Sequence, residues 1–363
     1  GPLFIGTSGM TGKHFNPIWM TSQPQFLAFP MILPALTWFN NQVQPIPHLA
    51  EKIDVNADAT VYTFTLPQKA AWSDGTPLTA KDVVFTFKLA VHPAIGQSVW
   101  TTNFRGIKGM ADYIKDPTKD VPGLEAVDDR TVRITLNAPN AAFLFNTYLG
   151  ILPSHILGKV KPEDIEKDPY VDKPTVTSGP YDFVKFEPGQ YIQLKKKANY
   201  WGTAAKIDEV FIKMFESTAT MLAQFEAGEV QVLPQVPADE VERFRKMQHV
   251  SILPVKGIGY YVLHIDQRTK DQIAALNKPK DQGGDGYNIQ KEPKPYLLDK
   301  RFRQALAYAL DEASIIKVVV NGEGVPIQSS IIGPDWAINP NLNKYSLNLD
   351  KAKALMTEAG VTF

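Results

Sequence analysis

The chain has 363 residues, of which 44% are hydrophobic, and its 38 Lys and Arg residues balance its 38 Asp and Glu residues. This length and hydrophobic content predict a large buried core shared between two or three domains, and the balanced charge argues against a nucleic acid partner. Cysteine is absent, which excludes disulfides, thiolate zinc sites and a cysteine nucleophile.

The first half of the chain predicts strands with one clear helix between them. Residues 3–7 (LFIGT) form a short strand pattern that runs into a Gly-rich loop, a common place for a ligand. Alternating side chains predict strands over 62–66 and 132–136, and KDVVFTFKLA predicts a helix over 81–90. The sheet therefore begins before the helix and continues after it.

Residues 72–82 (WSDGTPLTAKD) combine a tight turn with a helix start. Gly75 can adopt a positive φ in the turn, and Pro77 favours an extended stretch after it. Thr79 is the expected N-cap, and Asp82 suits the positive end of the helix dipole. The segment is therefore interpreted as a strand-to-helix corner without catalytic chemistry.

The middle of the chain predicts a mixed sheet with helical cover. Residues 177–197 are typical of two strands around the turn EPGQ, and 207–215 of a further strand. A helix is expected over 217–228, ending at Gly228, with a strand over 229–235.

The last part of the chain predicts a strand, a loop and three helices. Residues 257–266 form a dense apolar strand pattern, and the polar stretch 267–297 is expected to be a long surface loop. Residues 299–322 show a helical period that predicts two helices bent near Asp311, and 349–360 predicts another helix.

No pattern indicates an enzyme or a metal site. The six histidines are scattered without ligand spacing, and no nucleophile elbow, phosphate loop or dinucleotide fingerprint is present. Glu125, Asp128 and Asp129 cluster, but a turn between strands is a sufficient reason for these charges. We therefore predict no catalytic residue, no cofactor and no metal, with a hydrolase that uses these acids as a remote alternative.

The aromatic residues are more informative, because large flat side chains in loops and at strand ends can stack on sugars or pack against peptide side chains. Trp72 and Trp201 lie in compact turns and are expected to be core anchors. For Trp100 and Tyr260, ligand contact and core packing are equally consistent with the sequence. The other aromatic residues in such contexts are Trp19, Trp38, Phe104, Tyr261 and Trp336.

The order of motifs resembles that of the family 5 extracellular solute-binding proteins, the oligopeptide-, dipeptide- and nickel-binding receptors of bacterial ABC importers. The resemblance covers nearly the whole chain. It rests on PIPHLAEKIDV (45–55), YTFTLPQKAAWSDGTPLTAKDVVFTF (62–87), TSGPYDFVKFEPGQYIQLKKKANYW (177–201), KIDEVFIKMF (206–215) and RFRQALAYALDEASI (301–315).

The resemblance implies an α/β fold of the two-lobed periplasmic-binding-protein (Venus-flytrap) type, in its large three-domain form with mixed sheets. The first lobe would hold residues 1–45 and 175–255, and a smaller inserted domain residues 46–174. The second lobe would begin at 256 and be incomplete at the C-terminus, because in the family it continues well past the helix that matches 349–360. We therefore expect the sequence to lack the C-terminal part that the family has.

By resemblance, the function is to bind an oligopeptide or dipeptide between two lobes and to deliver it to the permease subunits of an ABC transporter. An oligosaccharide is the alternative ligand, since the chain has six tryptophans. The expected protein is a monomer in the periplasm or on the extracellular face of the membrane, although GPLFIGTSGM lacks a signal-peptide pattern. The ligand contacts that the family implies are Thr21, Ser22, Gln23, Trp100, Phe104, Tyr260 and Tyr261.

Overall fold

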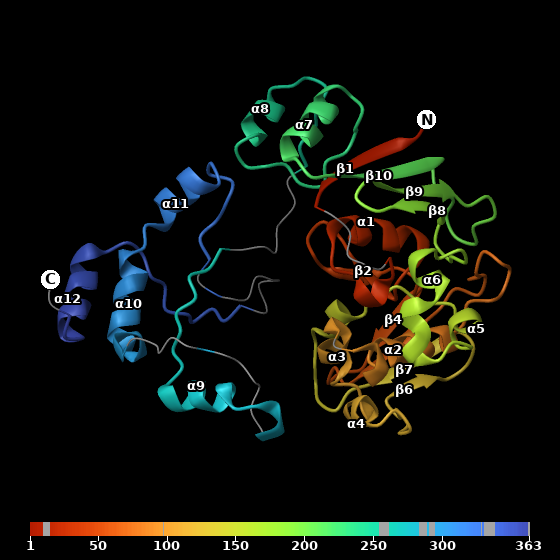
Figure 1. Ribbon diagram of the computed structural model, residues 1–363, viewed down its shortest axis with the longest axis horizontal. Coiled ribbons are helices and arrows are strands. Elements are labelled where there is room, and N and C mark those ends of the chain that lie inside the picture. Colours follow the sequence, from red (N-terminus) through yellow and green to blue (C-terminus); the bar gives the residue numbers. More distant parts are fainter. Residues whose placement is uncertain are drawn as a thin grey trace. The chain divides into compact units, whose positions relative to one another are not determined.

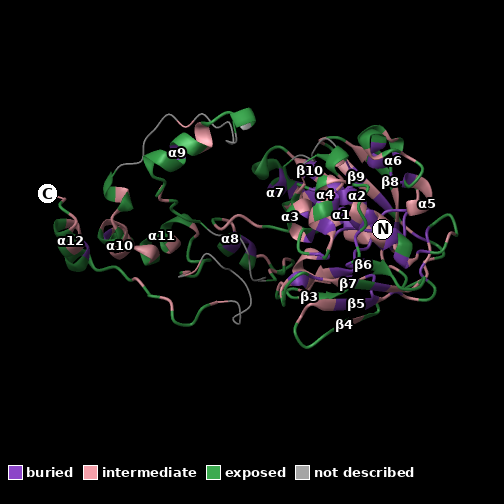
Figure 2. Cartoon of the chain, turned by 90° about the horizontal axis from the view of Figure 1, so that it is seen from below, coloured by how far each residue is buried: buried purple, intermediate pink, exposed green. Residues whose placement is uncertain are grey.

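The computed structural model describes residues 1–9, 15–96, 98–253, 261–282, 289, 295–327, 329 and 338–361. The chain divides into two compact units, Gly1–Val236 and Pro237–Phe363. Figure 1 shows the elements of both, and Figure 2 shows that buried residues are concentrated in the first unit. None of the helices within the described ranges has the length and hydrophobicity needed to cross a bilayer.

The first sheet of the first unit joins the N-terminus to residues more than two hundred positions later. Its order is β1-β10-β9-β8, with β1 parallel to β10 and the other pairs antiparallel. The strands are β1 (Leu3–Ser8), β8 (Tyr181–Glu187), β9 (Tyr191–Lys196) and β10 (Glu209–Phe215). Helix α1 (Gln23–Ile32) packs against all four strands, and α7 (Thr218–Glu226) contacts β1 and β10. The beginning of the chain is thereby held in the same core as residues 181–215.

The second sheet is made of residues within 52–135 and has the order β4-β5-β7-β6, antiparallel throughout. Its strands are β4 (Lys52–Val55), β5 (Val61–Thr65), β6 (Leu124–Ala126) and β7 (Thr131–Thr135). Tyr62 and Phe64 on β5 are buried while the threonines beside them are partly exposed, as a sheet with one covered face requires. Helix α2 (Ala80–Ala90) contacts β6 and β7.

Short elements connect these layers. A two-stranded hairpin pairs β2 (Thr37–Phe39) with β3 (Pro45–Pro47). The short helices of the first unit are α3 (Val99–Phe104), α4 (Met110–Lys115), α5 (Ser154–Leu157) and α6 (Pro169–Asp172). Short 3₁₀ helices occupy Pro17–Trp19, Pro93–Ile95, Phe143–Asn146 and Pro162–Lys167 in the first unit, and Lys280–Gln282 and Pro295–Leu298 in the second.

The described part of the second unit is helical. Its helices are α8 (Val241–Arg245), α9 (Lys270–Asn277), α10 (Lys300–Ala309), α11 (Glu312–Val319) and α12 (Leu349–Glu358). Helices α10 and α12 pack together, and Tyr308 on α10 contacts Tyr345 with ring centroids 5.1 Å apart. The two helices predicted over 299–322 and the one over 349–360 are thereby confirmed.

Most of the other predicted elements are also confirmed, and three differ. In place of a strand over 229–235 there is one bridge, from Val232 to Ile5, and Pro234 has no backbone N–H with which to extend the pairing. The predicted loop 267–297 contains α9, which a capping box of Thr269 and Gln272 initiates. Of the strand predicted over 257–266, residues 261–266 are not in a strand, and 257–260 lie outside the described residues.

Candidate functional site

Five aromatic side chains gather on the first unit and are called the aromatic patch below. Phe26 comes from α1, Trp38 and Phe39 from the hairpin strand β2, and Phe145 and Tyr148 from the 3₁₀ turn at Phe143–Asn146 and the residues after it. Phe26 is 41% exposed, and the other four are partly buried. Partly exposed aromatic rings that lie together are suited to stack on a ligand.

Tyr148 is the centre of the patch. Its ring centroid lies 5.6 Å from that of Phe39, 6.3 Å from Trp38 and 6.5 Å from Phe26. On its other side it packs against the buried Trp100 at 4.9 Å. Burial raises the pKa of the Tyr148 phenol, so the ring stays neutral at physiological pH. These contacts hold the Tyr148 ring in place within the patch.

The predicted contacts Thr21, Ser22 and Gln23 lie at the start of α1, one turn before Phe26. Ser22 is the N-cap and Gln23 the first helical residue. The buried side chain of Gln25 accepts hydrogen bonds from the backbone N–H groups of Thr21 (3.0 Å) and Ser22 (3.2 Å). This capping arrangement fixes the segment beside the patch, where Thr21 is exposed.

Trp100 and Phe104 lie on the inner face of α3 and are 1% and 0% exposed. The Trp100 indole N–H donates to the carbonyl of Ile18 (3.2 Å), in the turn just before Thr21. Phe104 stacks on Phe87 of α2 with a centroid distance of 4.2 Å. Both residues support the patch from beneath in this structure, and their direct contact with a ligand stays a prediction.

The remaining two predicted contacts belong to the later part of the chain. Tyr261 lies in the second unit and is 83% exposed. Tyr260 lies outside the described residues, as does Trp336. Their role as ligand contacts stays a prediction.

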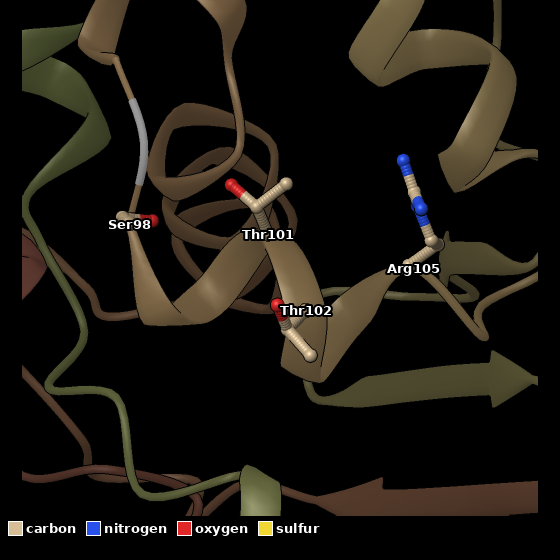
Figure 3. A pocket seen from close by; sticks show the side chains of 4 residues that line it. All are labelled: Ser98, Thr101, Thr102 and Arg105. Carbon is tan, nitrogen blue, oxygen red and sulfur yellow. The ribbon is translucent and has the colours of Figure 1, made fainter. Parts of the chain in front are cut away.

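A hollow on the outer face of α3 was not predicted from the sequence. It has a volume of about 270 Å³ and is lined by Ser98, Thr101, Thr102 and Arg105 (Figure 3). These positions follow the spacing i, i+3, i+4 and i+7 of one helical face, while Trp100 occupies the opposite side. That spacing is visible in the sequence and could have indicated a shared polar face, but not a hollow.

His48 supports the hairpin that carries Trp38. Its Nδ1 accepts a hydrogen bond from the backbone N–H of Ala35 (3.2 Å), and its ring also bonds the backbone of Pro30 on α1. Burial lowers the pKa of His48 to about 4. The imidazole is therefore neutral at pH 7, and its hydrogen bonds join the end of the hairpin to Ala35 and to Pro30 of α1.

The polar groups of the corner at 72–82 form hydrogen bonds within the protein. The carboxylate of Asp82, 2% exposed, accepts from the indole of Trp72 (3.3 Å), the backbone of Thr79 (2.8 Å) and both the backbone N–H (2.9 Å) and hydroxyl (2.6 Å) of Ser154. Thr79 and Asp82 form the capping box of α2, as predicted. Trp72 is 2% exposed and Trp201 is packed against the core, which confirms both as anchors.

The acids considered for a hydrolase are exposed and engaged locally. Asp128 accepts from the backbone N–H of Arg130 (2.8 Å), and this bond lowers the pKa of the carboxyl. Glu125 pairs with Arg133 and Asp129 with Lys81. A carboxyl with a lowered pKa is poorly suited to general acid catalysis. Within the described ranges, no group of three potential metal ligands occurs.

Comparison with solved structures defines the class of protein. The ABC transporter substrate-binding protein CtaP from Listeria monocytogenes superposes with a TM-score of 0.72 and 25% identity, covering 100% of this chain and 66% of that one. The oligopeptide-binding protein AppA from Bacillus subtilis, solved in complex with a nonapeptide, gives a TM-score of 0.68 at 23% identity, covering 99% and 64%. The fold is therefore the α/β fold of two-lobed solute-binding proteins, as predicted.

The sequence places the chain within that class. Residues 44–362 match the model of the bacterial extracellular solute-binding proteins, family 5 Middle, and the chain belongs to this family. It is 28% identical to the dipeptide-binding protein of Escherichia coli (strain K12) over 363 residues, which cover 96% of this chain and 62% of the relative. The chain spans about three fifths of the length of the curated relatives it matches.

Proposed function

We propose that this chain is part of an extracytoplasmic receptor that binds peptides and delivers them to the permease of an ABC importer. Family membership supports the role of a solute-binding protein, and relatives that bind dipeptides and oligopeptides support the ligand. The observation in the chain itself is the aromatic patch around Tyr148, in which Phe26 lies one turn after the start of α1. The receptor binds its ligand as a monomer, without a cofactor and without catalysing a reaction.

The proposed division into lobes follows from the way the sheets are built. The first lobe comprises 1–45 and 175–255, and the inserted domain 46–174. Pairing of β1 with β10 supports the discontinuous first lobe, and the second sheet, drawn wholly from residues within 52–135, supports the insertion. In this proposal the second lobe begins at 256, whereas the boundary between the two compact units of the structure falls after Val236.

The patch gives the receptor a way to bind peptides of varied sequence. Aromatic rings bury the apolar parts of ligand side chains without demanding one particular side chain. Hydrogen bonds to the ligand backbone would come from exposed polar groups such as Thr21 beside the patch. Ligand binding then shifts the population of the two lobes toward the closed state.

An oligosaccharide is the second candidate, and the same patch favours it. Trp38 and Tyr148 offer flat ring faces of the kind that stack on sugar rings. The two ligand classes differ in chemistry, because a peptide brings amide groups and side chains whereas a sugar brings hydroxyl groups. Their masses distinguish them directly.

The first test is native mass spectrometry of the full-length protein as purified, followed by denaturation. Released masses separated by amino-acid residues support the peptide receptor, and a series separated by hexose or pentose units would replace it with the sugar receptor. An empty protein is then titrated calorimetrically with tri- to pentapeptides and with xylan and glucan fragments. Binding of neither class would contradict both candidates.

The second test is the substitution Tyr148→Ala. Removing the central ring is expected to weaken ligand binding about tenfold or more, since aromatic contacts contribute about 0.5–1.5 kcal/mol each beyond their buried area. Tyr191→Ala is the matched control, because Tyr191 lies on the first sheet and packs against Phe211 instead. Equal ligand affinity of the two variants would contradict a role of the aromatic patch in ligand binding.

A further inference from the structure

Arg105 differs from every other arginine of the chain. The sequence has eight arginines, all within the described ranges. Seven pair with a carboxylate or donate to a carbonyl: Arg130 with Glu51, Arg133 with Glu125, Arg243 with Glu240, Arg245 with Glu323, Arg268 with Asp266, Arg301 with Asp299 and Arg303 with the carbonyl of Leu297. Within the described part of the chain, the Arg105 guanidinium has no hydrogen-bond or ion-pair partner.

The groups around Arg105 are suited to an anion. The hydroxyls of Thr101 and Thr102 make no side-chain hydrogen bond within the described part of the chain, and no carboxylate is among the four residues that line the hollow. Figure 3 shows Thr101 and Arg105 projecting to the same side of α3. Ser98 already donates its hydroxyl proton to the carbonyl of Ala90 (2.8 Å). The free groups are therefore a guanidinium and two hydroxyls, all able to donate.

The backbone beneath these groups is fixed. Trp100 and Phe104 anchor the inner face of α3 in the core, through the bond to Ile18 and the stack on Phe87. Trp100 also contacts Tyr148, the centre of the aromatic patch. The helix that carries Arg105 is thus connected to the patch through a single buried ring.

We propose that Arg105, with Thr101 and Thr102, binds a carboxylate of the transported ligand and makes the receptor selective for acidic ligands. The planar guanidinium can hold a carboxylate through two parallel N–H···O bonds, and the hydroxyls can donate to its remaining lone pairs. The nature of the ligand rests on the proposed function, whereas binding of a carboxylate rests on the hollow alone. The group can come from a peptide terminus or from an acidic side chain.

The first experiment tests carboxylate binding without any peptide. The arginine Nε–H resonances are followed by NMR while sodium acetate is added, with sodium chloride at equal ionic strength as reference, and Arg105→Lys assigns the signal. We expect a saturable shift of the Arg105 signal with acetate that Thr101→Val weakens. The seven paired arginines serve as internal controls. An Arg105 signal that responds equally to chloride and acetate overturns the proposal.

The second experiment identifies the source of the carboxylate in the full-length protein. Calorimetry compares Phe-Ala-Glu with Phe-Ala-Gln, and each with its C-terminal amide. Arg105→Gln is expected to lower the affinity at least tenfold for the peptide whose carboxylate binds Arg105. The affinity for the matching neutral peptide is expected to stay unchanged. The control is Arg133→Gln, which removes a paired surface arginine. Equal losses for acidic and neutral peptides overturn the proposal.

The two experiments separate this inference from the proposed function. An acetate response without binding of any peptide contradicts the peptide receptor and leaves the carboxylate site standing. Peptide binding without an acetate response contradicts the carboxylate site alone. The competing interpretation is that Arg105 only caps the C-terminal end of α3. In that case Arg105→Gln lowers the melting temperature and changes neither the acetate response of the protein nor its preference between Glu and Gln peptides.

Discussion

His48 is expected to make the protein less stable in mild acid. The group has a pKa of about 4 in the folded protein and 6.5 as its ordinary value. Because the folded pKa is depressed, the unfolded chain takes up the proton first as pH falls below 6.5, and the folded state loses relative stability until about pH 4. Above 6.5 both states are neutral and His48 contributes no pH dependence.

The magnitude follows from these two values. The loss is about 1.4 kcal/mol at pH 5.5, about 2.6 kcal/mol at pH 4.5 and about 3.4 kcal/mol at full protonation. The physical cause is local. A protonated ring would be charged in a poorly hydrated place, and its Nδ1 could no longer accept from the buried N–H of Ala35.

The assay is urea denaturation at pH 7.5, 6.5, 5.5 and 4.5, comparing the natural protein with His48→Gln. Glutamine offers one acceptor and one donor but does not titrate, so the difference between the two proteins removes the contribution of the carboxylates. We expect the stability of the natural protein to fall relative to the variant by the amounts above. Parallel curves over this range would refute the reasoning.

Three further substitutions test the scaffold around the site. Asp82→Asn should lower the free energy of unfolding by about 2–4 kcal/mol, because one carboxylate oxygen becomes an N–H₂ group that faces hydrogen-bond donors. Thermal denaturation measures the loss, with Asp74→Asn as a control that is expected to cost less. Trp100→Phe should lower the free energy of unfolding by about 2–3 kcal/mol and weaken ligand binding, because it leaves the Ile18 carbonyl without its hydrogen bond. Unchanged affinity would show that the turn at Ile18 does not contribute to ligand binding. Gly179→Ala should prevent stable folding, since the new Cβ would lie 2.2 Å from the Met31 carbonyl oxygen, and a native circular dichroism spectrum would contradict this.

Local chemistry explains which parts of the fold could be predicted. The prediction of the corner at 72–82 is confirmed, because turn and capping residues determine the backbone conformation of the few residues around them. Helix α1 was missed because Pro24 and Pro30 interrupt a stretch that is apolar on nearly all sides and has no helical period. Helix α9 was missed although its capping box, Thr269 and Gln272, is visible in the sequence, because the polar composition around it favoured a loop.

The site was less predictable because it depends on contacts between distant segments. Phe26 and Tyr148 are separated by more than a hundred residues, and only the folded chain brings their rings together. For Trp100 the sequence left ligand contact and core packing equally open, and in this structure the side chain is buried. The missing partner of Arg105 could not be predicted either, because an ion pair depends on which carboxylates the fold brings within reach.

Helix α3 suggests how a receptor of this family can change its ligand without losing its fold. Its inner residues, Trp100 and Phe104, are fully packed, so substitutions there act on the core and on the turn before α1. Its outer residues, Thr101 and Arg105, make no side-chain hydrogen bond or ion pair within the described ranges, so substitutions there cost little stability. Because one face carries the packing and the other the polar groups, selectivity for charge can change through exposed positions while the aromatic patch stays in place.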